Sequence, residues 1–179
     1  MFGKKIKLQN SIRIFLSLFA LALISLGCQR DDICPESTLI TPLLKIAFIE
    51  AEPEVAGDTI PKIPTNLSVR AVGVDTDYPI TVNTSEISIP LKTDADFTTY
   101  QFTLNTPADS DTTSEGNTDV INFTYARNES YINRACSFKV TYINLEAEKT
   151  PDTNNWIKRI RIDQSTVEDE KITNISIFH

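Results

Sequence analysis

Residues 99–105, TYQFTLN, decide the fold of this chain. Tyr100, Phe102 and Leu104 alternate in this stretch with polar residues. Because the side chains of a β-strand point alternately to its two faces, these three residues share one face and their polar neighbours share the other. Such a period of two is typical of a strand in an antiparallel sheet that has one face buried and the other in water.

The same alternation recurs on both sides of this stretch. It predicts strands over residues 43–50, 67–74, 86–91, 99–105, 120–125, 137–145, 156–163 and 171–178. The residues expected to share a face are Leu44/Ile46/Phe48, Leu67/Val69/Ala71, Ile87/Ile89/Leu91, Ile121/Phe123/Tyr125 and Phe138/Val140/Tyr142. Pro90 cannot donate to a sheet ladder, so its strand is expected to lie at an edge or to end there. We therefore expect an all-β fold, an antiparallel β-sandwich of immunoglobulin-like or related type with about eight strands.

Length and composition limit the possible functions. The chain has 179 residues, 41% of them hydrophobic, and a formal net charge of −7. That length suits one domain with a real core, and the acidic balance argues against a nucleic-acid partner. The single histidine, His179, is the last residue of the chain. A frayed chain end cannot support a Ser-His-Asp triad, a Cys-His pair or a zinc site.

The first 27 residues have the features of a secretory signal peptide. Four cations (Lys4, Lys5, Lys7 and Arg13) precede an apolar run over residues 14–27, and the segment has no acidic residue. As a helix, that run would rise about 21 Å, which is short of a bilayer core of about 30 Å. The pattern therefore predicts a cleaved signal peptide over residues 1–27 and not a transmembrane anchor.

The signal ends in Ser25-Leu26-Gly27-Cys28, which resembles the lipobox of bacterial lipoproteins. The resemblance implies cleavage before Cys28 and attachment of lipid to its thiol and to its new amine. Two or more acyl chains hold a protein firmly on a membrane. Cleavage leaves 179 − 27 = 152 residues and removes four cations, so the formal charge moves from −7 to −11. We expect a lipidated tether over residues 28–40 and one domain over residues 41–179.

Two cysteines remain after Cys28, namely Cys34 and Cys136. An even remainder in an exported protein predicts a disulfide, and a loop of about 100 residues would contribute about 4–5 kcal/mol in the chain-entropy model. Two separate buried thiols are the alternative. Cys136 shares strand parity with Phe138 and Val140, so we expect it to point into the core. Two cysteines are too few for a metal site, and the redox motif CxxC is absent.

Candidate chemical sites are few. Asp109, Asp111, Glu115 and Asp119 cluster in an acidic stretch, but Ser114 and Val120 stand where a calcium-binding EF-hand loop needs Gly and Glu. A solvated loop is therefore expected, with no metal and no cofactor. No pair of carboxylates is marked out for catalysis, so we expect no enzyme activity. A carboxylate-dependent, glycoside-hydrolase-type enzyme that acts on glycans, or an accessory subunit of one, is the alternative.

Residues 156–162, WIKRIRI, place an aromatic residue beside three cations. They could grip an anionic glycan or the acidic face of a partner protein. We favour a strand whose outward charges prevent edge-to-edge aggregation. Whether Trp156 belongs to the core or to a contact surface stays open.

The run Cys28-Gln29-Arg30-Asp31-Asp32 resembles the surface-export signal of Bacteroidota lipoproteins. Residues 28–44, 89–96 and 134–136 further resemble an uncharacterised flavobacterial lipoprotein family that is known only as a domain of unknown function. The likeness implies a β-rich envelope lipoprotein and supplies no catalytic residues. We expect an outer-membrane lipoprotein that faces the cell surface and serves as a binding or structural module. Its partners would be the membrane, through the lipid, and an envelope protein or a glycan.

Overall fold

The computed structural model describes residues 33–36, 38, 40–51, 59–80, 83–106 and 116–179. Over these residues the chain is all β, with no helix. The strands are β1 (Leu44–Ile49), β2 (Ser68–Ala71), β3 (Glu86–Ile89), β4 (Phe97–Leu104), β5 (Asn117–Asn133), β6 (Ser137–Lys149), β7 (Arg159–Ile162) and β8 (Ile175–Phe178). All eight overlap the predicted segments. The expected signal peptide, Cys28 and the export residues Gln29, Arg30, Asp31 and Asp32 lie outside the described residues.

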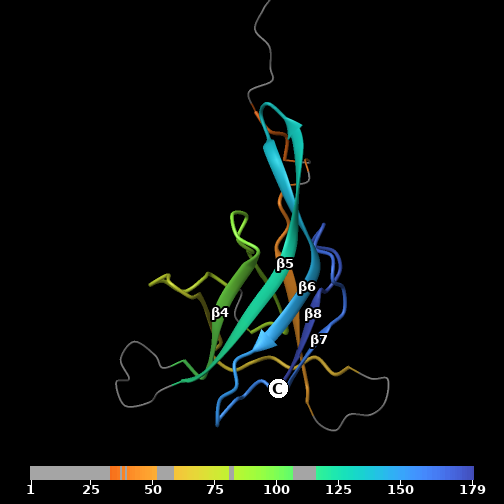
Figure 1. The fold of residues 1–179 in the computed structure, drawn as a ribbon. Coiled ribbons are helices and arrows are strands. Elements are labelled where there is room, and N and C mark those ends of the chain that lie inside the picture. The colour runs from red at the N-terminus through yellow and green to blue at the C-terminus, as the bar shows by residue number, and fades with distance from the viewer. Residues whose placement is uncertain (1–32, 37, 39, 52–58, 81–82, 107–115) are drawn as a thin grey trace, which may run out of the picture.

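The strands form two four-stranded sheets, ordered β3-β1-β8-β7 and β2-β4-β5-β6. Figure 1 shows the two layers in the lower half of the molecule. Their inward side chains make a single core, which confirms the expected β-sandwich class. The buried hydrophobic residues of this core are Leu44, Ile46, Phe48, Val69, Ile87, Ile89, Leu91, Tyr100, Phe102, Ile121, Phe123, Tyr125, Val140, Tyr142, Leu145, Trp156, Ile157, Val167, Ile175 and Ile177.

The first sheet departs from the expected antiparallel pairing. β1 pairs with β8 in parallel, with Ile46 opposite Ile175 and Phe48 opposite Ile177, while its other neighbour, β3, is antiparallel. Alternation along one strand says which face is buried but not which way a neighbour runs, so this pairing has no local signal. β3 lies at a sheet edge and ends at Ile89, as Pro90 predicts.

β5 and β6 are much longer than expected. They form a hairpin whose outer half rises beyond the other strands (Figure 1). Alternation of buried residues continues along β5 to Tyr125 and then stops, because both faces of the outer half are largely in water. Bulges interrupt the hairpin register between Thr124 and Ala126 and between Tyr131 and Asn133. The hydrophobic pattern therefore marked only the part of each strand that packs in the sandwich.

The expectation that Cys136 points into the core is wrong. Cys136 lies in the turn between β5 and β6, at the far end of the hairpin, and is only partly buried. Phe138, which was placed on the same inward face, is also exposed. The inward face of β6 begins only at Val140, because the strand has left the sandwich by the time it reaches the turn.

Candidate functional site

Three buried tyrosines meet at the base of the hairpin. Tyr100, Tyr142 and Tyr125 donate hydrogen bonds to the successive carbonyls of Pro90, Leu91 and Lys92, at 2.7, 3.0 and 3.1 Å. These carbonyls belong to the connection between β3 and β4, where the chain crosses from one sheet to the other. The Tyr142 hydroxyl thus satisfies the carbonyl of the buried Leu91, and the other two hydroxyl groups find their own partners on either side of it.

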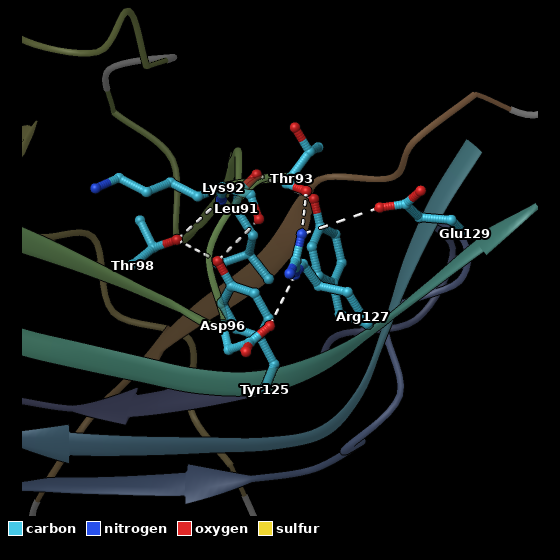
Figure 2. A network of polar contacts seen from close by, with 9 residues as sticks. Leu91, Lys92, Thr93, Asp96, Thr98, Tyr125, Arg127 and Glu129 are labelled. Carbon is cyan, nitrogen blue, oxygen red and sulfur yellow. Dashed lines mark hydrogen bonds and ion pairs between the residues drawn. The ribbon is translucent and has the colours of Figure 1, made fainter. Parts of the chain in front are cut away.

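Thr98 completes this cluster from β4. Its hydroxyl contacts the Tyr125 hydroxyl at 2.5 Å and accepts a hydrogen bond from the Lys92 backbone N–H at 2.9 Å (Figure 2). Burial raises the pKa of Tyr100 and that of Tyr142 to about 12. A tyrosine held protonated and bonded to main-chain oxygens cannot serve as a catalytic base near neutral pH. The cluster therefore has a structural role, which is to fix the β3–β4 connection to β4, β5 and β6.

Arg127 of β5 links the connection between β3 and β4 to the hairpin of β5 and β6. Figure 2 shows its guanidinium between Asp96 and the Thr93 carbonyl, to which it donates at 2.8 and 2.7 Å, with Glu129 at 4.0 Å. The Asp96 hydrogen bond raises the pKa of Arg127, so the side chain stays charged. The guanidinium thus ties residues 93–96 to the point where β5 leaves the sandwich.

An open groove lies on the outer face of the first sheet, with a volume of about 330 Å³. Ala47 and Ile49 of β1 and Ser176 of β8 contribute outward-facing side chains to it. The full lining is Ala47, Phe48, Ile49, Thr59, Pro61, Ser85, Glu86, Arg161, Asp163, Ile172, Thr173 and Ser176. Apolar and hydrogen-bonding groups are mixed in this lining, as they are in sites that bind small ligands.

The charged groups of the groove are already engaged. Glu86 pairs with Lys45 at 3.0 Å, and Asp163 pairs with Arg161 at 2.6 Å. Asp163 also accepts a hydrogen bond from the Ser176 hydroxyl. A glycoside hydrolase needs one carboxylic acid in an apolar pocket and a second carboxylate across a cleft. The two carboxylates that the groove offers are instead each paired with a cation.

The expectation of a solvated loop is wrong for Asp119, which is buried near the start of β5. One of its carboxylate oxygens accepts from Asn155 Nδ2 at 2.9 Å, and the other accepts from the Ile157 backbone N–H at 2.7 Å. It therefore holds the connection that carries Trp156. Asp109, Asp111 and Glu115 lie outside the described residues. Among the residues that the structure describes, no group of three His, Cys, Asp or Glu side chains could hold a metal ion.

The WIKRIRI segment divides between core and edge. Trp156 is buried, stacks on Phe48 and donates from Nε1 to the Phe102 carbonyl at 3.0 Å, so it belongs to the core. Arg159 and Arg161 project from β7, an edge strand, and lie 3.7 and 5.3 Å from the Phe178 ring centroid. This arrangement fits the charged-edge interpretation, because the cations both protect the edge and cover an aromatic ring.

His179 is not frayed, which corrects the expectation for the chain end. Its backbone exchanges hydrogen bonds with Ile49 and Ala51, and its ring packs edge-on against Phe48 and Trp156. Burial lowers the pKa of His179; the hydrogen bond with the Lys62 carbonyl and the Glu50 charge oppose this shift, and the Lys62 ammonium adds to it. The ring Nε2 also lies 3.4 Å from the Lys62 carbonyl oxygen.

The predicted disulfide between Cys34 and Cys136 is present. It joins the N-terminal segment to the turn of the hairpin, where the Cys136 N–H donates to Asn133 Oδ1 at 2.7 Å. From the disulfide the N-terminal segment returns along β6, where Thr41 Oγ1 accepts from the Val140 N–H at 3.0 Å.

The groove and the tyrosine cluster were not predicted from the sequence. Each is assembled from strands that are distant along the chain, and none of their residues forms a recognisable motif. A weak signal existed for the cluster, because Tyr100, Tyr125 and Tyr142 fall on predicted inward faces where a phenol needs a partner. Arg161 was identified, but as part of a charged strand and not as a groove residue.

Comparison with known proteins gives one match. Residues 66–179 match the model of a family of unknown function, DUF6452. The expected likeness to a domain of unknown function is confirmed to that extent. No curated protein and no solved structure matches the chain. Among the described residues there is no helix long and apolar enough to span a membrane.

Proposed function

Because this chain belongs to the DUF6452 family, whose function is unknown, we propose a function from its own residues. It is an outer-membrane lipoprotein, anchored through Cys28 and facing the cell surface, and its sandwich is a binding or structural module of the cell envelope. The lipobox-like Ser25-Leu26-Gly27-Cys28 and the export-like Gln29-Arg30-Asp31-Asp32 support the anchor and its direction. We include in this proposal that the chain is similar to flavobacterial lipoproteins.

The observation that carries the proposal is the disulfide. Cys34 and Cys136 are separated by 102 positions in the chain and meet at the end of the hairpin. Disulfides persist in oxidising compartments and are rare in the cytosol of mesophiles. A cross-link that begins six residues after Cys28 therefore agrees with an exported chain whose lipid tether is joined to its folded body.

The groove on the first sheet is the surface that we assign to binding. Ala47, Ile49, Pro61 and Ile172 supply apolar contact, and the Arg161–Asp163 pair supplies charge at its border. An envelope protein or a glycan would bind there through mixed apolar and hydrogen-bonded contacts. Since both carboxylates of the groove pair with cations, we propose that the protein is not an enzyme.

Replacing the lipid cysteine tests the anchor. The Cys28→Ala protein should move from the membrane pellet to the soluble fraction, whereas Cys34→Ala should stay in the pellet because its lipid site is intact. If the Cys28→Ala protein still sediments with membranes, the anchor assignment is wrong. Replacing Asp31 and Asp32 with Ala should reduce labelling of intact cells while leaving the protein membrane-bound. Unchanged labelling would remove the export claim.

A charge reversal tests the binding surface. The envelope protein or glycan that is recovered with the lipidated wild-type protein from intact membranes should bind less to the Arg161→Glu protein than to the Arg70→Glu protein. Both arginines pair with an aspartate at the surface, but Arg70 lies outside the groove. Equal recovery by the two variants would exclude the groove. Hydrolysis of an envelope glycan by the purified protein would favour the enzyme alternative.

A further inference from the structure

The outer end of the hairpin carries an exposed aromatic pair. Tyr131 and Phe138 face each other across β5 and β6, with ring centroids 5.3 Å apart. They are 61% and 59% exposed, and Ile33, next to the disulfide, is 81% exposed. We name residues 131–138 together with Ile33 the hairpin tip. Large apolar side chains that are exposed together at one end of a molecule mark a surface that contacts a partner or a membrane.

The disulfide limits how far the hairpin tip can lie from the lipid. Cys34 follows Cys28 by six residues, and a fully extended chain of that length spans about 20 Å. Because Cys34 is bonded to Cys136 in the turn, the limit applies to the tip itself. Without the bond, the tether would run on to Thr41, which contacts β6, and its reach would grow to about 45 Å. The cross-link therefore keeps the aromatic pair close to any membrane that holds the lipid.

We propose that the hairpin tip inserts Tyr131 and Phe138 into the headgroup region of the membrane that carries the Cys28 lipid. This inference rests on the anchor in the proposed function. Tyrosine, which has one polar end, favours this zone. Phenylalanine occurs on the apolar face of interfacial segments, which sink about 5–10 Å into it. Arg134 is exposed in the turn between the two aromatics, and in the inserted tip its guanidinium would bond lipid phosphates.

The acidic residues beside the hairpin set the depth of insertion. Val167 pairs with Tyr142, and the Lys139 ammonium donates to the Glu168 carbonyl at 3.0 Å. The exposed Glu168 and Glu170 therefore flank β6 just below the tip. Since carboxylates resist transfer from water, contact stops at the tip, and the hairpin holds the sandwich away from the membrane. The part of β5 that projects beyond the sandwich, residues 126–133, has a length of about 26 Å in an extended strand.

Fluorescence quenching by brominated lipids tests the insertion. The full lipidated protein, carrying Tyr131→Trp or Phe138→Trp, is reconstituted into vesicles of phosphatidylethanolamine and phosphatidylglycerol with brominated acyl chains. The indole at either position should lose emission roughly two-fold relative to vesicles without bromine, as expected for interfacial depth. Phe97→Trp is the matched control, because Phe97 is 51% exposed but pairs with Thr124 at the base of the hairpin. It should not be quenched, nor should the buried Trp156.

Two further measurements make the outcome decisive. Adding Cys34→Ser and Cys136→Ser to Tyr131→Trp should reduce the quenching, since the tether lengthens. The mass of the N-terminal peptide reports the lipid: an unmodified Cys28 would defeat the anchor proposal and this inference together. A lipidated, vesicle-bound protein with no quenching at position 131 would overturn the inference alone. A blue shift at position 131 that depends on protein concentration, without quenching, would assign the tip to a second copy and would also overturn it.

Discussion

At the scale of single residues, the molecule depends on polar side chains that satisfy buried backbone groups. Tyr142 is fully buried and donates to the Leu91 carbonyl. Asp119, also buried, receives the Ile157 N–H on one oxygen and Asn155 on the other. Both residues hold a connection between strands against the core. Replacing either residue would therefore loosen that connection as well as remove a hydrogen bond.

We predict that Tyr142→Phe lowers the free energy of unfolding by about 1–2 kcal/mol, because the buried Leu91 carbonyl loses its donor while the ring still fills its space. Urea denaturation measures the change. Tyr131→Phe, which removes a hydroxyl from an exposed ring, should leave the midpoint where it is. Equal effects of the two variants would contradict the role given to the tyrosine cluster.

His179 makes stability depend on pH. Burial lowers its pKa in the folded protein, so the unfolded chain binds a proton more readily. The folded state is therefore stabilised above about pH 6.5, the ordinary histidine pKa, and loses this contribution as pH falls from there through the lowered value. Thermal unfolding between pH 7.5 and 5.5 should show a falling midpoint. His179→Phe, which keeps the ring packing without the titration, should flatten the profile, and an unchanged slope would exclude His179 as its cause.

At the scale of elements, β7 shows how a short edge strand is protected. It alternates arginine and isoleucine, and its two arginines cover the Phe178 ring of β8. The pairing of Arg159 with Phe178 and of Arg161 with Ser176 places these cations directly across from the residues that they shield. The two arginine side chains thus place charge on the β7 edge and also bury the Phe178 ring.

Replacing Arg159 and Arg161 with Thr should promote self-association, because the edge loses its charge and Phe178 becomes exposed. Size-exclusion chromatography over a concentration series would detect this association. Lys158→Thr with Lys171→Thr removes the same charge from exposed positions outside β7 and should stay monomeric if the wild type is. If both double variants associated to the same degree, net charge and not edge protection would be responsible.

At the scale of the whole molecule, the long hairpin and the disulfide define a long axis. The N-terminal segment meets the hairpin turn at one end, and residue 179 lies at the opposite end, at the lower ends of the sandwich strands (Figure 1). β1 runs between these ends, in the centre of the first sheet. The cross-link therefore ties the start of the described chain to the point farthest from the sandwich core.

Removing the disulfide with Cys34→Ser and Cys136→Ser should lower the free energy of unfolding by as much as about 4–5 kcal/mol, because the 102-residue separation makes a long loop. Chemical denaturation compares the variant with the wild type and with Cys28→Ser, whose disulfide is intact. Peptide mapping without reductant should recover Cys34 joined to Cys136 in the wild type. Free alkylation of both thiols in the native protein would reject the bridge.

The positions of all eight strands and the cysteine pairing could be predicted from the sequence. Alternation in stretches such as residues 99–105 can be recognised from neighbouring residues alone. Two cysteines after a signal peptide can form one intramolecular pair. Tertiary structure alone decided the parallel pairing of β1 with β8, the outer half of the hairpin, and the meeting of Tyr100, Tyr125 and Tyr142 on one connection. These features depend on contacts between distant segments, and the free energy of such contacts leaves no periodic trace in the residues that make them.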